Sequence, residues 1–412
     1  MDAERLTLHG DPVAFATHLR ARVPAPESVA LSVGEIIERV RETGDGAVID
    51  FTERFDDAQI DTLRIDEAEL ERAENALDPG VRAGLERAID NVRRVGEAGL
   101  DPDRTVEFDT HSVTVRTAPV KRAAVYVPGG RAPYPSTVIM GVVTARLAGV
   151  AEVAVSSPPP VDAVTLAACR LTGVERVYQM GGAHAIAALA YGTESVTPVD
   201  VIVGPGNLYV QEAKQQVSTE VGIDGFAGPS DLVVIADADA DPKLVALDLL
   251  AQAEHGPGTL VVAISPSLAL LADLATELID APDTGATGVV VEVAAMQDGL
   301  TLAQALAPEH LQLVGPAAEA LAPDVTCAGC VFVGASAGTA FGDYIAGSNH
   351  ILPTNGAARF ASGLSAATFR RRFSEVRIED PSGLAEAAAR IARAEGFELH
   401  ARSMEARIRD NH

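Results

Sequence analysis

Between about residue 123 and residue 237, short runs rich in β-branched residues alternate with stretches of helical pattern. This alternation is typical of a parallel sheet, because each crossover helix returns the chain to the same edge of the sheet. The segment therefore predicts a Rossmann-like unit. Its strands are expected at 123–127, 153–156, 176–180, 199–203 and 232–236, and its helices near 137–148, 162–172, 183–191 and 208–219.

Further β-branched runs predict a second parallel sheet, with strands at 259–264, 289–293, 311–314 and 331–333. The fold class expected is α/β, with two Rossmann-like parallel-sheet domains, one of them discontinuous, and small helical extensions at both ends. The predicted parts are an N-terminal helical extension, 1–21, a discontinuous domain, 22–122 and 231–365, a Rossmann-like domain, 123–230, and a helical tail, 366–412. The tail carries little apolar surface, so we expect it to dock on another subunit.

Composition narrows the class of protein. The 412 residues are 47% hydrophobic, contain no run of about 18 uncharged apolar residues, and begin without a signal peptide's pattern. A soluble cytoplasmic protein is expected, and three cysteines agree with a reducing compartment. Cys327 and Cys330 form a C-x-x-C, but no second pair completes a zinc site, so we interpret them as structural.

The net charge of −26 makes nucleic acid an unfavourable partner. Self-repulsion of this size is tolerable where salt screens it, so the acidic surface indicates a salt-rich cell interior. Attraction of a small cationic substrate is the alternative reading, and the spread of the charge along the chain favours adaptation to salt.

Glycine-bearing turns follow three of the predicted strands, at 128–130, 181–182 and 204–207. Their backbone amides could hold phosphate. None matches G-x-G-x-x-G, so tight-turn geometry explains them at least as well. A ligand is still expected at the carboxyl ends of these strands.

Polar side chains able to do chemistry are concentrated in five segments: 227–231, 251–256, 307–310, 342–354 and 395–400. Gln252 and His255 share a helix face, and with Asp343 and His400 they offer two nitrogen and two oxygen ligands, a set that suits Zn²⁺. Taken singly, each residue has a simpler reading as a cap, a turn or a hydrogen-bonded core residue. Spacing alone does not decide between the two.

Seven longer motifs resemble those of the histidinol dehydrogenase family, in the family's order and spacing. They are VYVPGGRAPYPST at 125–137, GGAHAIAALAYGT at 181–193, VGPGNLYVQEAK at 203–214, AGPSD at 227–231, AQAEHG at 251–256, APEHL at 307–311 and GDYIAGSNHILPT at 342–354. The resemblance covers nearly the whole chain.

The resemblance implies a homodimer that oxidises L-histidinol to L-histidine through the aldehyde, reducing two NAD. It implies that Zn²⁺ is bound by Gln252, His255, Asp343 and His400, the last supplied by the partner subunit, and that the substrate lies against these ligands. Further substrate contacts are implied at Ser230, His310, His350 and Glu395, and NAD contacts at Tyr126, His184 and Asn207 in 123–230.

Glu309 and His310 match the family's acid/base pair. A histidine with a pKa near ~6.5 can take the alcohol proton as hydride leaves, and the neighbouring carboxylate can activate the water that hydrates the aldehyde. Two departures stand out. His184 replaces the usual glutamine, which predicts altered NAD affinity. The sequence of 334–341, just before Asp343, also departs from the family's usual pattern.

Other functions remain open. A zinc- and NAD-dependent alcohol dehydrogenase acting on another small polar alcohol, such as a hydroxylated sulfonate, is the nearest alternative, although Glu395 disfavours an anionic substrate. A metal-dependent hydrolase would use Glu309 to activate water and would not reduce NAD. A non-catalytic binding protein is disfavoured by the intact Glu309–His310 pair.

Overall fold

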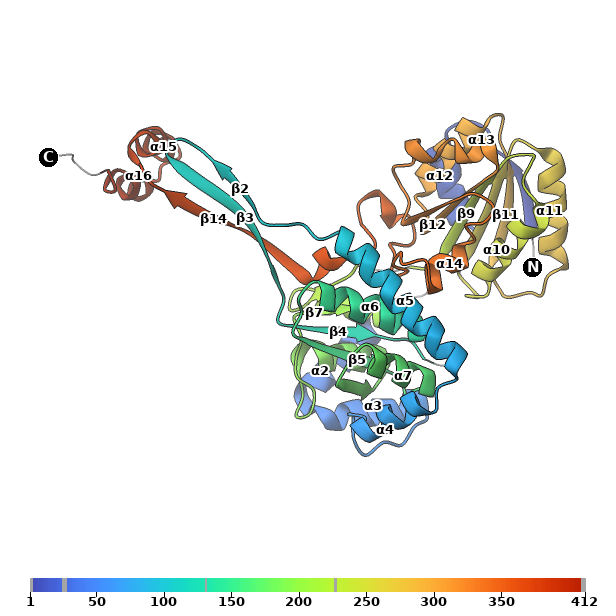
Figure 1. Ribbon diagram of the computed structural model, residues 1–412, viewed down its shortest axis with the longest axis horizontal. Coiled ribbons are helices and arrows are strands. Elements are labelled where there is room, and N and C mark those ends of the chain that lie inside the picture. Colours follow the sequence, from blue (N-terminus) through green and yellow to red (C-terminus); the bar gives the residue numbers. More distant parts are fainter. Residues whose placement is uncertain (1–2, 24–27, 130–131, 226–227, 409–412) are drawn as a thin grey trace. The chain divides into compact units, whose positions relative to one another are not determined.

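The computed structural model describes residues 3–23, 28–129, 132–225 and 228–408. The chain forms two compact units (Figure 1). Unit 1 comprises Met1–Gly99 and Val120–Phe369, and unit 2 comprises Leu100–Pro119 and Arg370–His412.

Unit 1 contains a six-stranded parallel sheet in the order β1-β11-β10-β9-β12-β13. All six residues of β9 are buried, and they alternate between two cores, Leu232 and Val234 on one face and Val233 and Ile235 on the other. A strand covered on both faces has this continuous apolar sequence. The strands are β1 (Ala3–Thr7), β9 (Asp231–Ala236), β10 (Leu260–Ser265), β11 (Thr287–Glu292), β12 (His310–Val314) and β13 (Cys330–Val333).

Helices cover both faces of this sheet. One face carries α10 (Pro242–Ala253) and α11 (Leu268–Asp280), and the other carries α1 (Pro12–Arg20), α12 (Met296–Leu306) and α13 (Pro316–Glu319). Asp241 caps helix α10 by accepting the N–H of Lys243 at 2.9 Å, and Pro242 is the first helical residue. Short elements complete this part: η1 (Ala322–Asp324), α14 (Thr339–Tyr344), η2 (Ala357–Arg359) and η3 (Ala366–Phe369).

The second parallel sheet of unit 1 has the order β6-β5-β4-β7-β8. Its strands are β4 (Arg122–Tyr126), β5 (Glu152–Ser157), β6 (Arg176–Gln179), β7 (Val201–Val203) and β8 (Gly222–Ile223). One face packs against α4 (Glu67–Asn75), α5 (Pro79–Ala98), α6 (Pro135–Leu147) and α7 (Ala163–Leu171). The other packs against α2 (Ala30–Thr43), α3 (Asp45–Asp56), α8 (Gly182–Tyr191) and α9 (Leu208–Val217). The expected α/β class with two Rossmann-like sheets is confirmed.

Two features of the N-terminal third differ from expectation. We expected 22–122 to join 231–365, but α2–α5 pack against the sheet of β4–β8. An amphipathic helix can cover any apolar sheet face, so its own sequence does not choose between two sheets. The helix predicted after Asp11 is α1, whereas the residues before it form β1, an edge strand of the other sheet.

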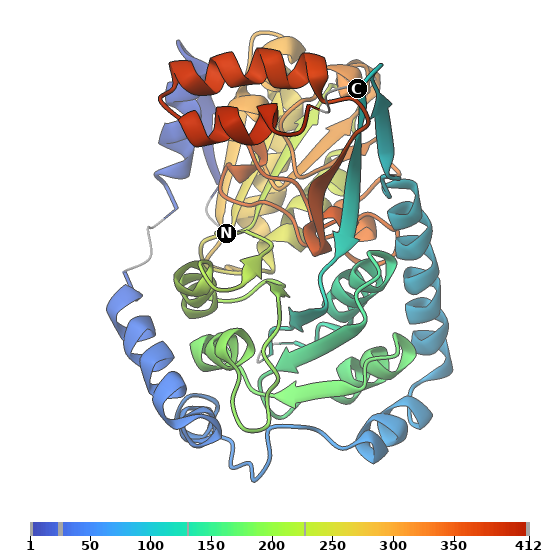
Figure 2. The same ribbon diagram turned by 90° about the vertical axis from the view of Figure 1, so that its left-hand side faces the viewer.

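Unit 2 is an antiparallel sheet followed by two helices that lie side by side (Figure 2). Its elements are β2 (Arg104–Glu107), β3 (His111–Pro119), β14 (Arg370–Ile378), α15 (Ser382–Ala394) and α16 (Glu398–Glu405), with β14 paired to β3 and β3 to β2. The expectation that the chain becomes helical beyond Arg370 is wrong for β14, because its arginine-rich sequence lacks a clear apolar alternation. Within the described residues, the core cluster of the helical part consists of Ala389, Ala392 and Ala401, with Met404 packed against them.

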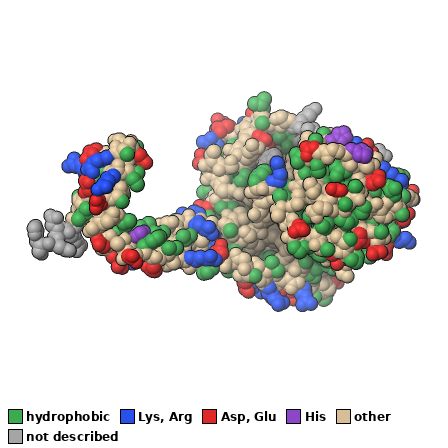
Figure 3. Space-filling model, turned by 90° about the horizontal axis from the view of Figure 1, so that it is seen from above, with side chains coloured by type: hydrophobic (Ala, Val, Ile, Leu, Met, Phe, Trp, Pro, Cys, Tyr) green, Lys and Arg blue, Asp and Glu red, His purple; other side chains and the backbone are tan. Residues whose placement is uncertain are grey.

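Acidic side chains are scattered over the face seen in Figure 3 rather than gathered in one patch, which agrees with a general surface adaptation. Among the described residues, no helix is both long and apolar enough to cross a membrane.

Candidate active site

Glu309 and His310 lie at the amino end of β12, next to the first residues of β9. The register pairs His310 with Leu232, which sets Glu309 beside Asp231. Glu309 is 6% exposed and His310 3%. Gln252 and His255 also lie on this side, since they come at the end of α10 just before β10. Glu309, His310, Gln252 and His255 therefore lie on the amino side of the first sheet.

The His310 ring lies between two carboxylates. Its Nε2 is 3.4 Å from Asp343 Oδ1, and its Nδ1 is 3.9 Å from Glu309 Oε2, too far for a hydrogen bond. Nδ1 is buried and without a partner among the described residues. A neutral ring with its proton on Nε2, facing Asp343, leaves the Nδ1 lone pair available to accept a proton.

Burial and charge shift the pKa values of this group. Burial raises the pKa of Glu309 to about 7 despite the nearby His310. For His310, burial disfavours the cation, but Asp343 and Glu309 outweigh it and the pKa is raised. For Asp343, burial favours the neutral acid, but His310, followed by His350 and His255, holds the pKa below its usual range.

His350 fixes the backbone at Asp343. Its Nδ1 lies 2.8 Å from the Asp343 carbonyl, which can only accept, so Nδ1 carries the proton. Its Nε2 is 3.2 Å from Thr137 Oγ1, whose hydroxyl donates to the neutral ring. Both ring nitrogens of His350 therefore have partners within the protein. A contact between His350 and the substrate stays a prediction, and it would be additional to the role of His350 in holding the Asp343 backbone.

Three of the four predicted zinc ligands lie in unit 1, and the fourth lies in unit 2. The charge of His255 contributes to lowering the pKa of Asp343, after the larger effect of His310. The Gln252 side chain is buried, and its Nε2 has no partner among the described residues. His400 lies on α16, exposed, with its ring 5.2 Å from that of Phe397. No group of three His, Cys, Asp or Glu suited to a metal occurs among the described residues. Of these four residue types, the predicted set includes only His255 and Asp343 in unit 1, and its third member there is Gln252.

The remaining predicted substrate contacts are divided in the same way. The Ser230 hydroxyl hydrogen-bonds to Glu309. Glu395 is the exposed C-terminal cap of α15 in unit 2.

Cys327 and Cys330 are both free thiols.

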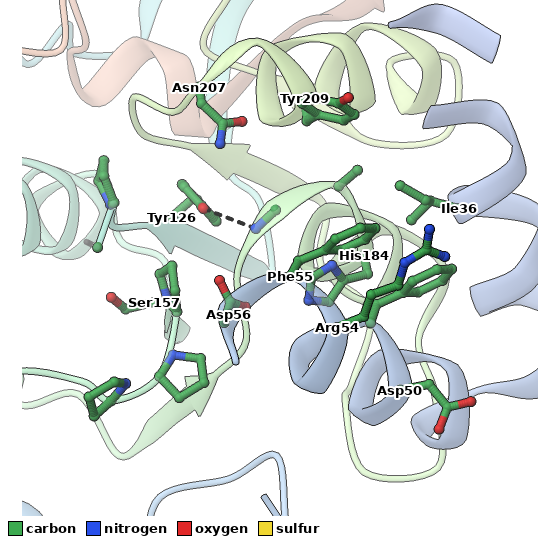
Figure 4. Close-up of a pocket in the computed structure, with 18 of the residues that line it drawn as sticks. Ile36, Asp50, Arg54, Phe55, Asp56, Tyr126, Ser157, His184, Asn207 and Tyr209 are labelled. Atoms are coloured by element: carbon green, nitrogen blue, oxygen red, sulfur yellow. Dashed lines mark hydrogen bonds between the residues drawn. The ribbon is translucent and has the colours of Figure 1, made fainter. Parts of the chain in front are cut away.

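A cavity of about 1590 Å³ lies at the carboxyl edge of the second sheet (Figure 4). Tyr126, His184 and Asn207, the three residues predicted to contact NAD, all line it. Tyr126 Oη accepts the N–H of Gly182 at 3.1 Å, and burial raises its pKa to about 12. Asn207 caps α9 through Val210 N–H at 3.1 Å. The sequence expectation of a ligand site at these strand ends agrees with the cavity.

His184 presents a free acceptor in this cavity wall. The single proton of Thr52 Oγ1 is donated to Val48 O at 2.8 Å, so at the 3.2 Å contact the His184 Nε2 must donate. That tautomer leaves Nδ1 unprotonated, and Nδ1 is buried with no partner in the described part of the chain. Burial lowers the pKa of His184 to about 4, which keeps the ring neutral.

Comparisons with known proteins show the family of the chain. The sequence model of the family described as histidinol dehydrogenase matches residues 20–408. The chain is 43% identical to the histidinol dehydrogenase of Natronomonas pharaonis over 93% of this chain and 94% of that one. It is 42% identical to that of Pseudomonas putida over 96% and 95%. The crystal structure of histidinol dehydrogenase from Elizabethkingia anophelis superposes with a TM-score of 0.92, at 28% identity, covering 99% and 98%.

The chain belongs to the histidinol dehydrogenase family. Membership makes it an NAD-dependent oxidoreductase. Within this histidinol dehydrogenase fold, the motif-based predictions missed several residues that the structure brings to the two sites. Asp231 contacts Glu309 and pairs with Arg20, Asp56 lines the cavity, and Thr52 contacts His184 in the cavity wall.

Different signals could have found them. Asp231 opens an apolar strand within AGPSD, where a carboxylate needs a partner. Arg20 and Thr52 carry no local signal, because their partners lie far along the chain.

Proposed function

We propose that this chain oxidises L-histidinol to L-histidine through L-histidinaldehyde, with two hydrides passed to two NAD. The observation that carries the proposal is the buried Glu309–His310 pair, in which His310 Nδ1 has a free lone pair and Asp343 lies behind Nε2. A proton acceptor and a water-activating carboxylate are both needed for an alcohol-to-acid oxidation.

Zn²⁺ would be held by Gln252, His255, Asp343 and His400 of the partner subunit. Nitrogen and oxygen donors suit this ion. Gln252 supports this set because its buried Nε2 has no partner among the described residues, so no hydrogen bond of that nitrogen holds the amide away from a metal that its oxygen would bind. When bound, the metal supplies a fixed positive centre for the amine and imidazole of histidinol.

In the first half-reaction, His310 takes the hydroxyl proton while the carbon loses a hydride to NAD. Asp343 stabilises the imidazolium that forms, and its own lowered pKa keeps it ionised. The products are the aldehyde, NADH and a proton on His310.

In the second half-reaction, ionised Glu309 removes a proton from a water molecule that adds to the aldehyde carbon. The hydrate anion that forms loses a hydride to a second NAD, and the resulting carboxylic acid releases its proton to solvent and leaves as the carboxylate. Ser230 and the Asp231 backbone hydrogen-bond to Glu309, which directs its oxygens without protonating them.

NAD would occupy the cavity lined by Tyr126, His184 and Asn207. The cavity volume accommodates a dinucleotide, and the unpaired Nδ1 of His184 supports a donor from the ligand. The helices of unit 2 enclose only a small alanine cluster among the described residues, and this supports a homodimer in which Glu395 and His400 of the partner subunit reach the substrate.

The test measures NADH absorbance when the purified protein, zinc and NAD meet L-histidinol in high salt. Two NADH per histidinol consumed, with L-histidine as product, is the expected result. His310→Ala should abolish the reaction, and His9→Ala, at an exposed histidine in the same unit, should not. Absence of NADH, or one NADH with released aldehyde, would contradict the proposal.

A further inference from the structure

Asp231 holds Glu309 at two points. Its Oδ1 accepts the Glu309 backbone N–H at 2.6 Å, and its own backbone N–H donates to Glu309 Oε2 at 3.3 Å. Asp231 is 2% exposed, so this bracket is shielded from water. The backbone and the carboxylate of the proposed water-activating residue are thus both oriented by one side chain and its amide.

The buried carboxylate of Asp231 has its counter-charge at Arg20, at the end of α1. Arg20 Nη1 lies 3.0 Å from Asp231 Oδ2, the one ion pair of Asp231 recorded within the described part of the chain. Without a cation, a carboxylate this deeply buried would be driven towards its neutral form. Arg20 also keeps the negative charge of Asp231 from acting unopposed on Glu309, whose pKa that charge raises.

The same guanidinium fixes the segment that leads into Glu309. Arg20 Nη2 donates to the carbonyl of Leu306 at 2.5 Å, and Nη1 reaches Asn355 Oδ1 at 3.4 Å. Leu306 ends α12, and Ala307 then turns the chain with a φ of 47°. One rigid fork therefore holds both Asp231 and the turn before Glu309.

The docking of α1 makes this arrangement stable. Ala16 and Leu19 are buried in the core shared with α12 and the first sheet. Arg20 follows Leu19 directly, so the buried leucine sets where the guanidinium emerges. We infer that Arg20 is a positioning residue for Glu309, and that α1 serves the water-dependent half of the oxidation.

This inference rests on the proposed function, because it assigns Arg20 to the step in which Glu309 activates water. It predicts a selective defect. Arg20→Met should leave the first NADH per site forming within about twofold of the wild-type rate, and should slow the second at least tenfold. Stopped-flow absorbance with L-histidinol, and steady-state rates with L-histidinaldehyde, separate the two steps.

Arg22→Met is the matched control. Arg22 lies on the same segment but pairs with Glu4 at 2.7 Å, away from Glu309, so both NADH steps should stay within about twofold of wild type. Arg20→Lys keeps one charge for Asp231 but cannot also hold Leu306 through a second nitrogen, and should show the same selective defect in weaker form.

Equal slowing of both steps by Arg20→Met, or no slowing of either, overturns the inference. If Arg20→Met does not fold, the decision passes to Arg20→Lys, where an unaltered second step or an equal loss in both steps counts against it. Failure of the wild-type enzyme to form NADH would instead contradict the proposed function itself, so the two failures are distinguishable.

Discussion

At the scale of single residues, His184 shows how a hydrogen-bond network assigns a role that a residue name does not. Thr52 uses its proton on Val48, which forces the His184 tautomer and leaves a bare acceptor in the cavity wall. A glutamine offers both a donor and an acceptor, whereas this neutral ring offers only the acceptor.

Replacing His184 should therefore separate stability from cofactor affinity. His184→Leu removes the unpaired nitrogen, so the free protein should be at least as stable, while NAD affinity should fall roughly fivefold to tenfold for one lost hydrogen bond. His184→Gln retains an acceptor and should bind NAD within about threefold of wild type. Calorimetric titration of NAD and thermal melts without it provide the measurements, and weaker binding in His184→Gln than in His184→Leu would be inconsistent with an acceptor role.

Glu309 predicts a pH dependence whose sign follows from its role. As a base it must be ionised, and its pKa is raised to about 7, so the rate of the second NADH step should fall as pH drops below about 7. The first step should not share this dependence on Glu309. Stopped-flow profiles of wild type and Glu309→Gln test this, and a wild-type second step that stays flat from pH 8 to ~5 would contradict it.

The same shift affects folding stability. The folded protein binds a proton more tightly than the unfolded chain, so Glu309 costs stability as pH rises from its unfolded pKa, near ~4.5, through about 7. Glu309→Gln should be more stable than wild type above pH ~7, by on the order of 1–3 kcal/mol, and the difference should vanish below pH ~4.5. Urea unfolding at both pH values measures it.

At the scale of elements, strand–helix periodicity predicted the parallel strands well because both sheets are buried on both faces. β9 and β10 read as continuous apolar runs, and their bounds fall within two residues of those predicted. β14 escaped prediction because its side chains are mostly exposed and charged. The packing of α2–α5 against the sheet of β4–β8 could not be predicted from the sequence either, because which of two apolar sheet faces a helix covers depends on residues far along the chain.

The candidate site residues show the same contrast between local sequence patterns and long-range contacts. Motifs led to Glu309, His310 and the cavity residues, because they lie on short segments with distinctive sequence. Arg20 lies on a terminal helix and acts on residues more than 200 positions away, a pairing that no local pattern encodes.

The end of α10 offers a test of the metal site. Gln252 is buried with its amide unpaired, so Gln252→Leu should leave the metal-free protein as stable as wild type or slightly more so. It should weaken zinc binding at least tenfold, because one oxygen ligand is lost. Zinc titration and metal analysis after dialysis measure this, with Gln215→Leu, at an exposed glutamine of α9, as control. Undiminished zinc affinity in Gln252→Leu would remove this residue from the ligand set.

At the scale of the whole molecule, unit 2 makes dimerisation testable by complementation. His400→Ala and His310→Ala proteins should each be inactive, and each mixed dimer should regain up to about half of the activity of a wild-type dimer, because one of its two sites combines unaltered residues from both subunits. Tagged subunits allow heterodimers to be isolated before assay. Inactive verified heterodimers would rule out His400 of the partner subunit as a ligand.

The net charge of −26 predicts that stability depends on ionic strength. The screening length falls from ~10 Å at 0.1 M to ~3 Å at 1 M salt, so repulsion between the scattered carboxylates weakens. The melting temperature should rise by at least about 5 °C over this range, equally in NaCl and KCl. Stabilisation by sulfate alone would instead indicate a general effect of water exclusion.

Strand β1 has a consequence for synthesis on the ribosome. It pairs with β11, whose residues are made more than 280 positions later. At ~5–20 residues per second, the N-terminal segment emerges tens of seconds or less before its sheet partners exist. The sheet of β4–β8, whose strands end at Ile223, is complete earlier. The nascent chain therefore acquires the cavity at the edge of that sheet first, and the first residues translated are among the last to reach their final place.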